Sequence, residues 1–427
     1  MRLPSPAGGL GADFARLWTA SAVSNLGDGA LLVAAPLLAA SLTRDPTSIA
    51  AVVVAAQLPW LLLSLHAGAL VDRVDRRAAM VAADLLRAAA LALLGAAALT
   101  GWASVPLIAA VAFAATAGDV VFTGAAHALL PALVPREALQ DANARLTGGE
   151  VVANGFLGQP LAGALFAVAA GLPFLLDAAS FVASALILLR LRRRVAPPPP
   201  AEGRPPLRSD IAEGLRWLWR DAPMRAVTAL LAVTNLVSGM QLAVLVLFAL
   251  DVLGLGPAGY GLLLAAAAVG ALVGSVVAPS LGRRAGVGPT VVGAILVEGA
   301  ALLALGLGSS RSLAVAMLGL GGLVGVVWHV TTLSLRQASV PDRLLGRVTS
   351  AQRLVGAGTV PVGALLGGLL SEALGLRAPF VLGGAALLLT GAAALALAPR
   401  LLAHDENIAA GRVSRPSMGA DSTLTGS

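Results

Sequence analysis

The chain contains neither cysteine nor lysine, and charged side chains make up only 12% of its 427 residues. Without cysteine it has no disulfides and no thiolate ligands for a metal ion. Without lysine it has no P-loop of the form G-x-x-x-x-G-K-[ST], which argues against ATP-driven transport by this chain alone. A charged fraction this low cannot cover the surface of a water-soluble protein of this length. These absences point to a membrane protein.

Apolar residues dominate the composition, at 58% of the chain and a mean hydropathy of +0.87. A membrane-spanning helix needs roughly 20 consecutive apolar residues. The apolar runs between glycine, proline and charged residues therefore predict an all-α membrane protein with twelve spans in two pseudo-symmetric six-helix bundles. The expected spans are 14–40, 48–68, 79–99, 105–131, 147–168, 173–191, 224–250, 259–280, 288–307, 312–335, 348–370 and 378–398.

Arginine is distributed unevenly among the connections between these spans. One alternating set holds only Arg44, Arg311 and Arg377, and the other set holds the remaining arginines. Connections rich in arginine stay in the cytoplasm, so the rich set is predicted to be cytoplasmic. An even number of spans then places both termini in the cytoplasm.

The composition also divides the chain into four parts. We expect an N-terminal six-helix bundle over 1–193, a cytoplasmic linker over 194–222, a C-terminal six-helix bundle over 223–400 and a disordered cytoplasmic tail over 401–427. Four consecutive prolines, Pro197 to Pro200, favour a semi-rigid polyproline II spacer. The stretch 211–220, I-A-E-G-L-R-W-L-W-R, predicts a short amphipathic helix. Its tryptophans either lie at the lipid interface or pack beneath the bundle.

The two halves contain related segments. Residues 24–29, S-N-L-G-D-G, are echoed by residues 234–239, T-N-L-V-S-G, at an offset of 210. Gly68 matches Gly274, and Val134-Pro135 matches Val340-Pro341, both at an offset of 206. Such repeats indicate a duplication about an axis along the membrane normal, in which a substrate site lies near the midplane between the halves.

Several segments carry a family resemblance. Residues 68–77, G-A-L-V-D-R-V-D-R-R, are similar to the signature loop of the major facilitator superfamily, with Asp75 where a glycine is usual. Residues 155–163 are similar to its antiporter motif, except that Gln159 separates Gly158 from Pro160. The segments 128–144, 177–181 and 340–350 resemble the drug and siderophore exporters of that superfamily, the enterobactin-exporter-like and macrolide-efflux-like group.

The resemblance implies a transporter in a bacterial cytoplasmic membrane that works by alternating access. It favours export of a small hydrophobic or amphiphilic molecule, such as a drug, siderophore or other natural product, in exchange for protons. A proton-coupled or facilitative importer is the first alternative, and a membrane sensor or an intramembrane enzyme is a more distant one. The chain shows no nucleophile with a partnered base, so no enzyme activity is expected. We expect a monomer in the lipid bilayer, with no cofactor, no metal and no nucleic-acid partner.

Two motifs supply candidate gating residues. By resemblance, Asp72 holds the cytoplasmic side closed against the facing half, while Arg76 and Arg77 bind nearby acids or lipid. The alternative is that these arginines only mark topology. The candidate gating loop consists of Gly68, Asp72, Arg73, Arg76 and Arg77, and the antiporter-like motif of Gly155, Gly158, Pro160 and Gly163.

Ionisable residues inside the spans need a reason to be there, because a charge at the bilayer centre costs roughly 2.5 kcal/mol or more. Asp28 and Asp119 fall mid-span in the first and fourth helices, which line the cavity by resemblance, and are our proton-coupling candidates. They could instead bond backbone groups at glycine-broken helices. Asp84 and Arg87 lie three residues apart and predict a structural ion pair. Asp177 falls near the outer end of the sixth span, where a charged side chain can reach the polar interface at little cost in free energy.

Other polar residues inside the spans are weaker candidates for the substrate cavity. Each could equally hold helices together across an interface. His329 could bind substrate, relay a proton or lie in such an interface. The substrate-cavity candidates are Asn25, Asn235, Gln241, Trp328, His329 and Arg336.

Overall fold

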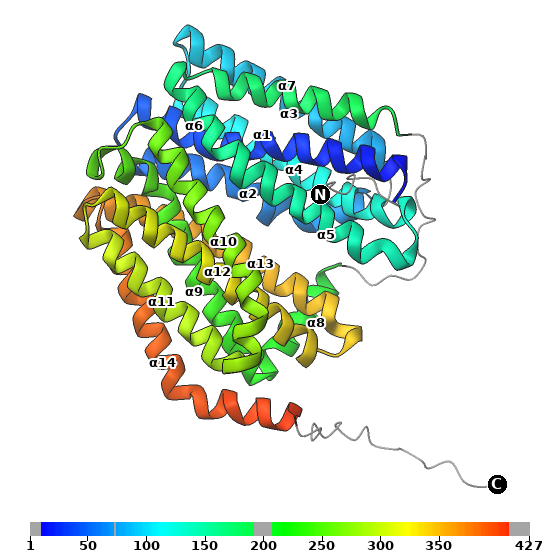
Figure 1. The fold of residues 1–427 in the computed structure, drawn as a ribbon, viewed down its shortest axis with the longest axis vertical. Coiled ribbons are helices and arrows are strands. Elements are labelled where there is room, and N and C mark those ends of the chain that lie inside the picture. The colour runs from blue at the N-terminus through cyan, green and yellow to red at the C-terminus, as the bar shows by residue number, and fades with distance from the viewer. Residues whose placement is uncertain (1–9, 72–73, 192–206, 410–427) are drawn as a thin grey trace, which may run out of the picture.

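The computed structural model describes residues 10–71, 74–191 and 207–409, and within these ranges the chain is helical with no strand. Figure 1 shows two bundles, the N-terminal half above the C-terminal half. The first half contains α1 (Ala12–Leu42), α2 (Pro46–Val71), α3 (Arg76–Thr100), α4 (Val105–Leu133), η1 (Arg136–Ala138), α5 (Leu139–Glu150), η2 (Val151–Gly158), α6 (Gln159–Val168) and α7 (Leu172–Leu188). The second half follows α8 (Leu207–Arg220) and contains α9 (Ala222–Leu247), η3 (Phe248–Val252), α10 (Pro257–Ala285), α11 (Val287–Leu307), α12 (Arg311–Ser339), α13 (Asp342–Leu374) and α14 (Ala378–Ala409).

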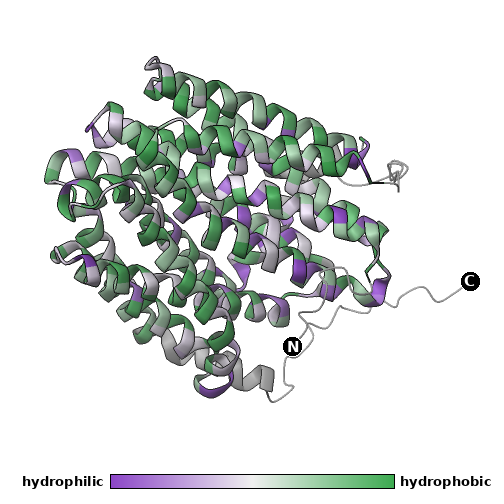
Figure 2. Cartoon of the chain, turned by 45° about the horizontal axis from the view of Figure 1, so that its top comes forward, coloured by the Kyte–Doolittle hydropathy of each residue, from purple (hydrophilic) through white to green (hydrophobic). Residues whose placement is uncertain are grey.

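Each of the twelve expected spans coincides with a helical segment. Among the described residues, eleven helical segments are long and apolar enough to cross a membrane, and α7 is a shorter apolar helix of 17 residues. Figure 2 shows hydrophobic residues along the helices, with hydrophilic residues toward their ends and at a few places within the bundle. Large apolar side chains such as Val168, Val276 and Leu389 are 72–78% exposed, as expected for helices that face lipid.

Local sequence explains where the helices start and stop. Proline occupies the first turn of α4, α7, α9 and α10, where its missing N–H leaves no helical bond unmade. Gly101 ends α3 at φ 82°, a backbone conformation that glycine adopts without strain. Asp75, which stands where the signature loop has glycine, is the N-cap of α3 and accepts a hydrogen bond from the N–H of Ala78 at 3.0 Å. The departure from the motif therefore replaces a turn residue by a helix cap.

The two halves repeat the same packing. In the first half α2 packs on α4 and α3 on α7, and in the second half α10 packs on α12 and α11 on α14. Val134 follows the end of α4 as Val340 follows the end of α12. Gly29 of α1 lies against the backbone of Asn154, and Gly239 of α9 lies against the backbone of Val360. These equivalences confirm that the matched segments occupy matching places.

The most extensive contacts between the halves are those of α2 with α13 and of α6 with α10. Gly368 of α13 lies against Pro46, Thr47 and Ala50 at the start of α2. On the same side Arg44 forms an ion pair with Asp251 of η3 at 3.3 Å. These contacts lie at the arginine-poor side, by which we mean the face with the connections that hold Arg44, Arg311 and Arg377. The halves are therefore closed against each other at that side.

The amphipathic helix is present as α8, and its residues divide between the two expectations. Trp217 is half-buried and packs against the cluster that Leu218 forms with Leu344 and Val348 of α13 beneath the bundle. Trp219 is 68% exposed and faces away from the bundle. An ion pair between Glu213 and Arg347 ties α8 to α13.

Two expectations need correction. The last helix continues to Ala409, so the predicted tail over 401–427 starts too early; residues 410–427 lie outside the described residues. Asp177, which we expected at an inexpensive position near a helix end, is 1% exposed. Hydropathy alone could not reveal this burial, because it results from the packing of α7 against α1 and α3.

Candidate substrate and proton site

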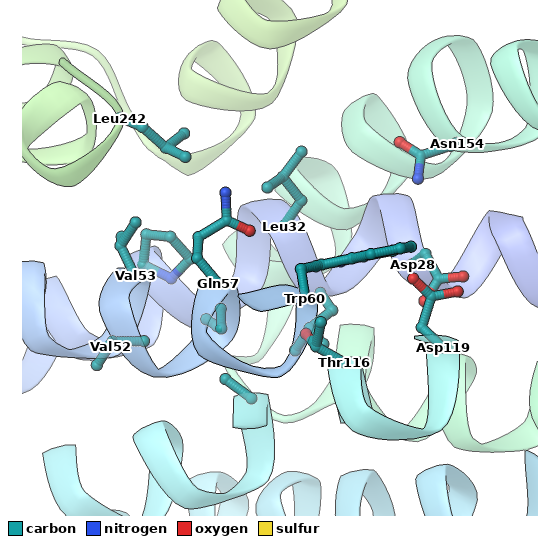
Figure 3. Close-up of a pocket in the computed structure, with 15 residues that line it drawn as sticks. Asp28, Leu32, Val52, Val53, Gln57, Trp60, Thr116, Asp119, Asn154 and Leu242 are labelled. Carbon is teal, nitrogen blue, oxygen red and sulfur yellow. The ribbon is translucent and has the colours of Figure 1, made fainter. Parts of the chain in front are cut away.

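A pocket of about 250 Å³ opens beside the middle of α1. Its walls are mainly aliphatic, with Trp60, Gln57, Thr116 and Asn154 as further members. Figure 3 shows the carboxyl groups of Asp28 and Asp119 at one end of the pocket, with the Trp60 ring extending toward them. The complete lining is Asp28, Leu31, Leu32, Ala35, Pro36, Val52, Val53, Ala56, Gln57, Trp60, Ala112, Thr116, Asp119, Asn154 and Leu242.

Glycines beside Asp28 bring the neighbouring helices close to it. A Cβ on Gly27 would lie 1.7 Å from the Asp177 carboxyl oxygen, and a Cβ on Gly29 would lie 2.3 Å from the Asn154 backbone oxygen. Any larger residue at either position would push α7 or η2 away. The glycine–aspartate–glycine sequence thus concentrates polar groups from three elements at one level of the bundle.

Asp28 is paired with Arg87 of α3. The Arg87 guanidinium donates a hydrogen bond to the Asp28 carboxylate. The Asp28 side chain is 19% exposed, whereas the Arg87 side chain is fully buried. Asp28 therefore joins the pocket to a charged group in the interior, and it does not merely bond backbone at a broken helix. Sequence reasoning missed this pair, because it assigned Arg87 to Asp84 alone.

Behind Asp28, Arg87 contacts a second carboxyl. Its guanidinium lies 3.7 Å from Asp84, which confirms the expected pair on α3. Ser24 links the two, because its hydroxyl accepts a hydrogen bond from Arg87 at 3.2 Å and donates one to Asp84 at 3.4 Å. Phe181 of α7 covers the guanidinium carbon, whose distance to the ring centre is 3.8 Å.

Asp119 lies at the same end of the pocket, on α4. Thr123, one turn further along, donates a hydrogen bond to its carboxylate at 3.2 Å. Asp119 is also within electrostatic reach of Arg87, Asp84 and Glu150. The structure therefore brings both proton-coupling candidates into one pocket.

The substrate-cavity candidates do not line this pocket. The Asn25 amide donates to the Ser21 carbonyl at 2.8 Å, and the Asn235 side chain lies against Gly356. Trp328 is 9% exposed, His329 is exposed and Gln241 is half-buried, all outside the pocket lining. Arg336 donates to Gln352 at 2.8 Å, and Gln352 in turn donates to Thr228 at 2.8 Å, which joins three helices of the second half. Leu242 is the one lining residue that the second half contributes to the described pocket.

Sequence reasoning also missed Gln57, Trp60, Thr116 and Asn154. Gln57 and Trp60 are polar or aromatic interruptions in an otherwise aliphatic span, which was a usable signal. Asn154 belongs to η2, and its place beside α1 depends on the local π-helical geometry that no sequence pattern indicated.

The gating loop is only partly described. Asp72 and Arg73 lie outside the described residues, and Gly68 falls within α2. Arg76 donates to the Ala128 carbonyl at 3.0 Å, and Arg77 donates to the Leu189 carbonyl. The expectation that these two arginines bind acids or lipid stays a prediction, and their described hydrogen bonds go to backbone carbonyls of their own half. They hold α3 to the ends of α4 and α7.

The antiporter-like motif packs between the halves. Gly158 lies against Leu26 and Gly29 of α1, and Gly163 lies against Pro257 and Gly261 of α10. Gly155 faces Ala268 of α10. Pro160 has no N–H, and the helix before it widens to π-helical geometry, with the Gln159 N–H bonding to the Asn154 carbonyl. The extra Gln159 also donates through its side chain to Asn154 at 3.3 Å.

The described residues contain no group of three or more histidine, aspartate or glutamate residues arranged to hold a metal ion. The charged groups at the pocket are two carboxyl groups, with the buried Arg87 behind Asp28. Two carboxylates placed in this way can bind a proton or a cation, and they can compete with each other for the guanidinium of Arg87.

Comparison with known proteins agrees with this architecture. A family model described as transmembrane secretion effector matches residues 10–421. The chain is 27% identical over 395 residues to the multidrug efflux pump Tap of Mycolicibacterium fortuitum, covering 90% of this chain and 94% of the pump. It is 31% identical over 363 residues to an uncharacterised MFS-type transporter of Mycobacterium tuberculosis, covering 80% of each.

Solved structures share the fold. A bacterial homologue of the iron transporter ferroportin, in an inward-facing state, superposes with a TM-score of 0.71 at 20% identity and covers 90% of this chain and 98% of that chain. The nucleoside transporter NupG superposes with a TM-score of 0.73 at 12% identity and covers 90% of this chain and 99% of that one. At these identities the likeness concerns the fold.

Proposed function

This chain belongs to the transmembrane secretion effector family of the major facilitator superfamily, and on that premise we propose that it exports a small hydrophobic or amphiphilic molecule in exchange for protons. It is a multi-pass membrane transporter, not an enzyme. The proposal places it as a monomer in a bacterial cytoplasmic membrane with both termini in the cytoplasm. The multidrug efflux pump among its relatives supports a drug-like substrate.

The observation that carries the proposal is a mainly aliphatic pocket that ends in two carboxyl groups. Asp28 and Asp119 lie inside the membrane region yet line a space that a molecule can enter. Aliphatic walls bind an apolar body, and a few polar groups fix its orientation. Carboxyl groups in such a place can exchange protons as the site opens to one side and then the other.

The contacts between the halves support loading from the cytoplasm. The Arg44–Asp251 pair and the contact of Gly368 with α2 close the arginine-poor side. If that side faces outward, as the arginine distribution predicts, the pocket in this state is closed to the outside. A substrate that enters from the cytoplasm would then leave when these contacts break and the opposite side closes.

Proton exchange gives this movement its direction. In the state described, Asp28 is held by Arg87. A proton that arrives from the outer side neutralises Asp28 and releases it from Arg87, and the same proton leaves to the cytoplasm when the pocket turns inward. Moving one charge through 100 mV is worth about 2.3 kcal/mol, enough to drive accumulation by more than about tenfold. In this cycle the gating loop around Asp72 holds the cytoplasmic side closed after the turn.

Everted membrane vesicles test both the activity and its direction. Vesicles that contain the full-length chain are prepared with an acidic internal pH, and their uptake of the fluorescent cation ethidium is followed. Export from the cell appears as uptake into these vesicles, and we expect uptake to fall when the pH gradient is collapsed. Vesicles without the chain are the control. Flux in the opposite direction under the same gradient would identify an importer, and flux that ignores the gradient would remove proton coupling.

A further inference from the structure

Arg87 is a fully enclosed charged group in the middle of the first half. Its side chain has no exposed surface, its stem passes Gly118 so closely that a Cβ there would lie 2.6 Å from it, and Phe181 covers its guanidinium. A guanidinium in such a place must keep a counter-ion, because an unpaired buried charge costs several kcal/mol. Release of Asp28 by protonation would leave Arg87 without one, unless another carboxylate takes over.

Asp84 meets that requirement. It is fully buried, lies 3.7 Å from the guanidinium and is linked to it through the Ser24 hydroxyl. Its other carboxyl oxygen is buried without a hydrogen-bond partner among the described residues. Asp84 is therefore close enough to hold Arg87 and has an oxygen left to receive it.

We propose that Asp84 and Arg87 form the buried half of the proton site, in which Asp84 is the permanent counter-ion of Arg87 and so allows Asp28 to bind and release a proton. This inference rests on the proposed proton exchange at Asp28. The Asp84–Arg87 pair on α3, which sequence alone predicts to be purely structural, thereby gains a role in proton binding at Asp28. Arg87 and Asp84 are positioning residues here, since neither lines the pocket.

The charges balance without a second proton. In the unprotonated state Arg87 is shared by the carboxylates of Asp28 and Asp84. When the Asp28 carboxylate takes one proton from pocket water, its hydrogen bond from Arg87 is lost and the guanidinium, still protonated, keeps Asp84. The reverse step returns that proton to pocket water and restores the shared state. The membrane region thus changes by one charge in each step.

Other charged groups face the same guanidinium and set the background potential. Asp177 is buried against Gly27, and Asp119 acts from the pocket side, with Glu150 and His127 beyond it. Neither Asp177 nor Asp119 is hydrogen-bonded to Arg87 in the structure, so their influence is through space. The groups that face Arg87 are Asp28 on α1, Asp84 on α3, Asp119 on α4 and Asp177 on α7.

Infrared spectroscopy of the full-length protein in lipid vesicles can follow Asp28 without knowledge of the substrate. The carbonyl band of protonated carboxyl groups is recorded as a function of pH, and the difference between a background and the same background with Asp28→Asn isolates Asp28. The backgrounds are wild type, Asp84→Asn, and the double variant Arg87→Gln with Asp84→Asn. The double variant removes the buried pair together, which a protein tolerates better than the loss of one partner.

The two backgrounds should move the Asp28 midpoint in opposite directions. With Asp84→Asn, Arg87 has only Asp28 as a close partner, so Asp28 should hold its charge to lower pH by about one unit or more. With the double variant, Asp28 has lost the cation that bonds to it, so its midpoint should rise above that of the wild type. Asp177→Asn should shift the midpoint in the same direction as Asp84→Asn but by less.

Glu298→Gln is the matched control. Glu298 is also a carboxyl inside a membrane helix, but it lies on α11 of the other half, and its replacement should leave the Asp28 midpoint unchanged. An Asp84→Asn midpoint equal to that of the wild type, or a shift in the same direction as the double variant, overturns the inference. If Asp84→Asn fails to accumulate in membranes, the double variant decides, and an unchanged midpoint there overturns it.

Failure of the proposed function would look different. Suppose that no carboxyl band can be attributed to Asp28 and that ethidium flux in Asp28→Asn follows the pH gradient as in the wild type. Then the proposal of proton coupling at Asp28 is wrong, and so is this inference. If Asp28 titrates and couples flux but ignores Asp84, only the inference about the buried pair is lost.

Discussion

The two halves of this transporter share a frame and differ in chemistry. Gly29 and Gly239 occupy equivalent places in α1 and α9, and each lets a neighbouring backbone oxygen approach to 2.2–2.3 Å of a would-be Cβ. The residue before each glycine differs: it is Asp28 in the first half and Ser238 in the second. Asp119 on α4 corresponds to Gly325 on α12 at the offset of 206. The close helix packing was kept in both halves, while the charged groups of the pocket belong to one.

The third helix of each half shows the same contrast. α3 carries the buried pair of Asp84 and Arg87, whereas α11 contains no arginine and has Glu298 as its one acidic residue. A fold that rocks two bundles against each other needs matched packing at both interfaces. A proton site needs its charges in one place, because separated single charges inside a membrane are each costly. The asymmetry is what these two requirements together predict.

The largest expected effect comes from replacing, one at a time, the two residues that differ between the equivalent places in α1 and α9. Asp28→Asn should lower gradient-driven ethidium accumulation by at least about tenfold, because no proton then moves in exchange for the substrate. Ser238→Asn, the same amide at the equivalent place in the second half, is the matched control and should keep most of the accumulation. The measurement is ethidium uptake in everted vesicles at equal protein content. Equal losses in both variants would mean that the halves are not specialised as described.

Because both halves use a glycine at the same close helix contact, replacing either glycine should lower the stability of the protein by a similar amount. Gly29→Val and Gly239→Val should each destabilise the protein by about 2 kcal/mol, because the new side chain meets a backbone oxygen that cannot move away easily. Thermal unfolding of the purified full-length protein measures the loss. Gly321→Val, at a glycine whose would-be Cβ has open space around it, should change little. A large loss in one half and none in the other would contradict the packing equivalence.

The pocket should depend on an aromatic side chain of the first half. Trp60 lines the pocket and is 37% exposed. Replacing it by alanine removes the aromatic face beside the two carboxyl groups, and should weaken the apparent affinity for ethidium by about five- to tenfold, the equivalent of roughly 1 kcal/mol. Trp102→Ala, which removes a 53% exposed tryptophan after α3, is the control. Concentration dependence of ethidium uptake separates affinity from maximal rate, and an unchanged affinity would remove Trp60 from the site.

The smallest effect concerns the first turn of the second helix in each half. Asp45 accepts hydrogen bonds from the backbone N–H groups of Thr47 and Ser48 at 3.1 and 3.0 Å at the start of α2, whereas α10 starts after Gly256 with no side-chain cap. The hydrogen bond from the Ser48 hydroxyl, with those from Thr47, holds the pKa of Asp45 below its usual 3.8. A carboxyl with a lowered pKa contributes stability that is present above pH 3.8 and is lost as the pH falls through the folded pKa.

Asp45→Ala should therefore destabilise the protein by about 1 kcal/mol at neutral pH. The difference from the wild type should shrink in acid, as the wild-type carboxyl becomes protonated. Unfolding temperatures measured from neutral pH to below pH 3.8 test this, and Gly256→Ala is the control, because it removes no cap bond. A difference that does not depend on pH would show that the cap works without its charge.

Particular residues show how far sequence reasoning reached. Asp28 and Asp119 were recognised because a charge within an apolar run is exceptional, and both line the pocket. Asp84 and Arg87 were paired correctly because they lie one helical turn apart. The bond between Arg87 and Asp28 was missed, and so was the burial of Asp177, because both depend on which helices are neighbours in space.

The polar candidates of the second half show where sequence lacks the needed information. Asn235, Gln241 and His329 are polar residues in apolar spans, as Asp28 is, and their sequence context is no different in kind. The structure places them outside the pocket, since direction around a helix axis decides whether a side chain faces a cavity, a neighbour or lipid. A periodicity in hydropathy cannot supply that direction when all faces of a helix are apolar.

Local hydropathy and the placement of arginine along the chain predict the twelve spans, the two halves and the arginine-poor side, because membrane insertion responds to hydropathy and to the charges next to each span. The same local pattern shows which side chains carry charge inside the membrane. Which of those charges meet depends on how the helices pack in space. Arg87 reaches Asp28 and Asp84 because Gly118 leaves room for its stem and Phe181 covers its head, and such contacts arise from the approach of several helices at once, a property of packing that no single stretch of sequence contains.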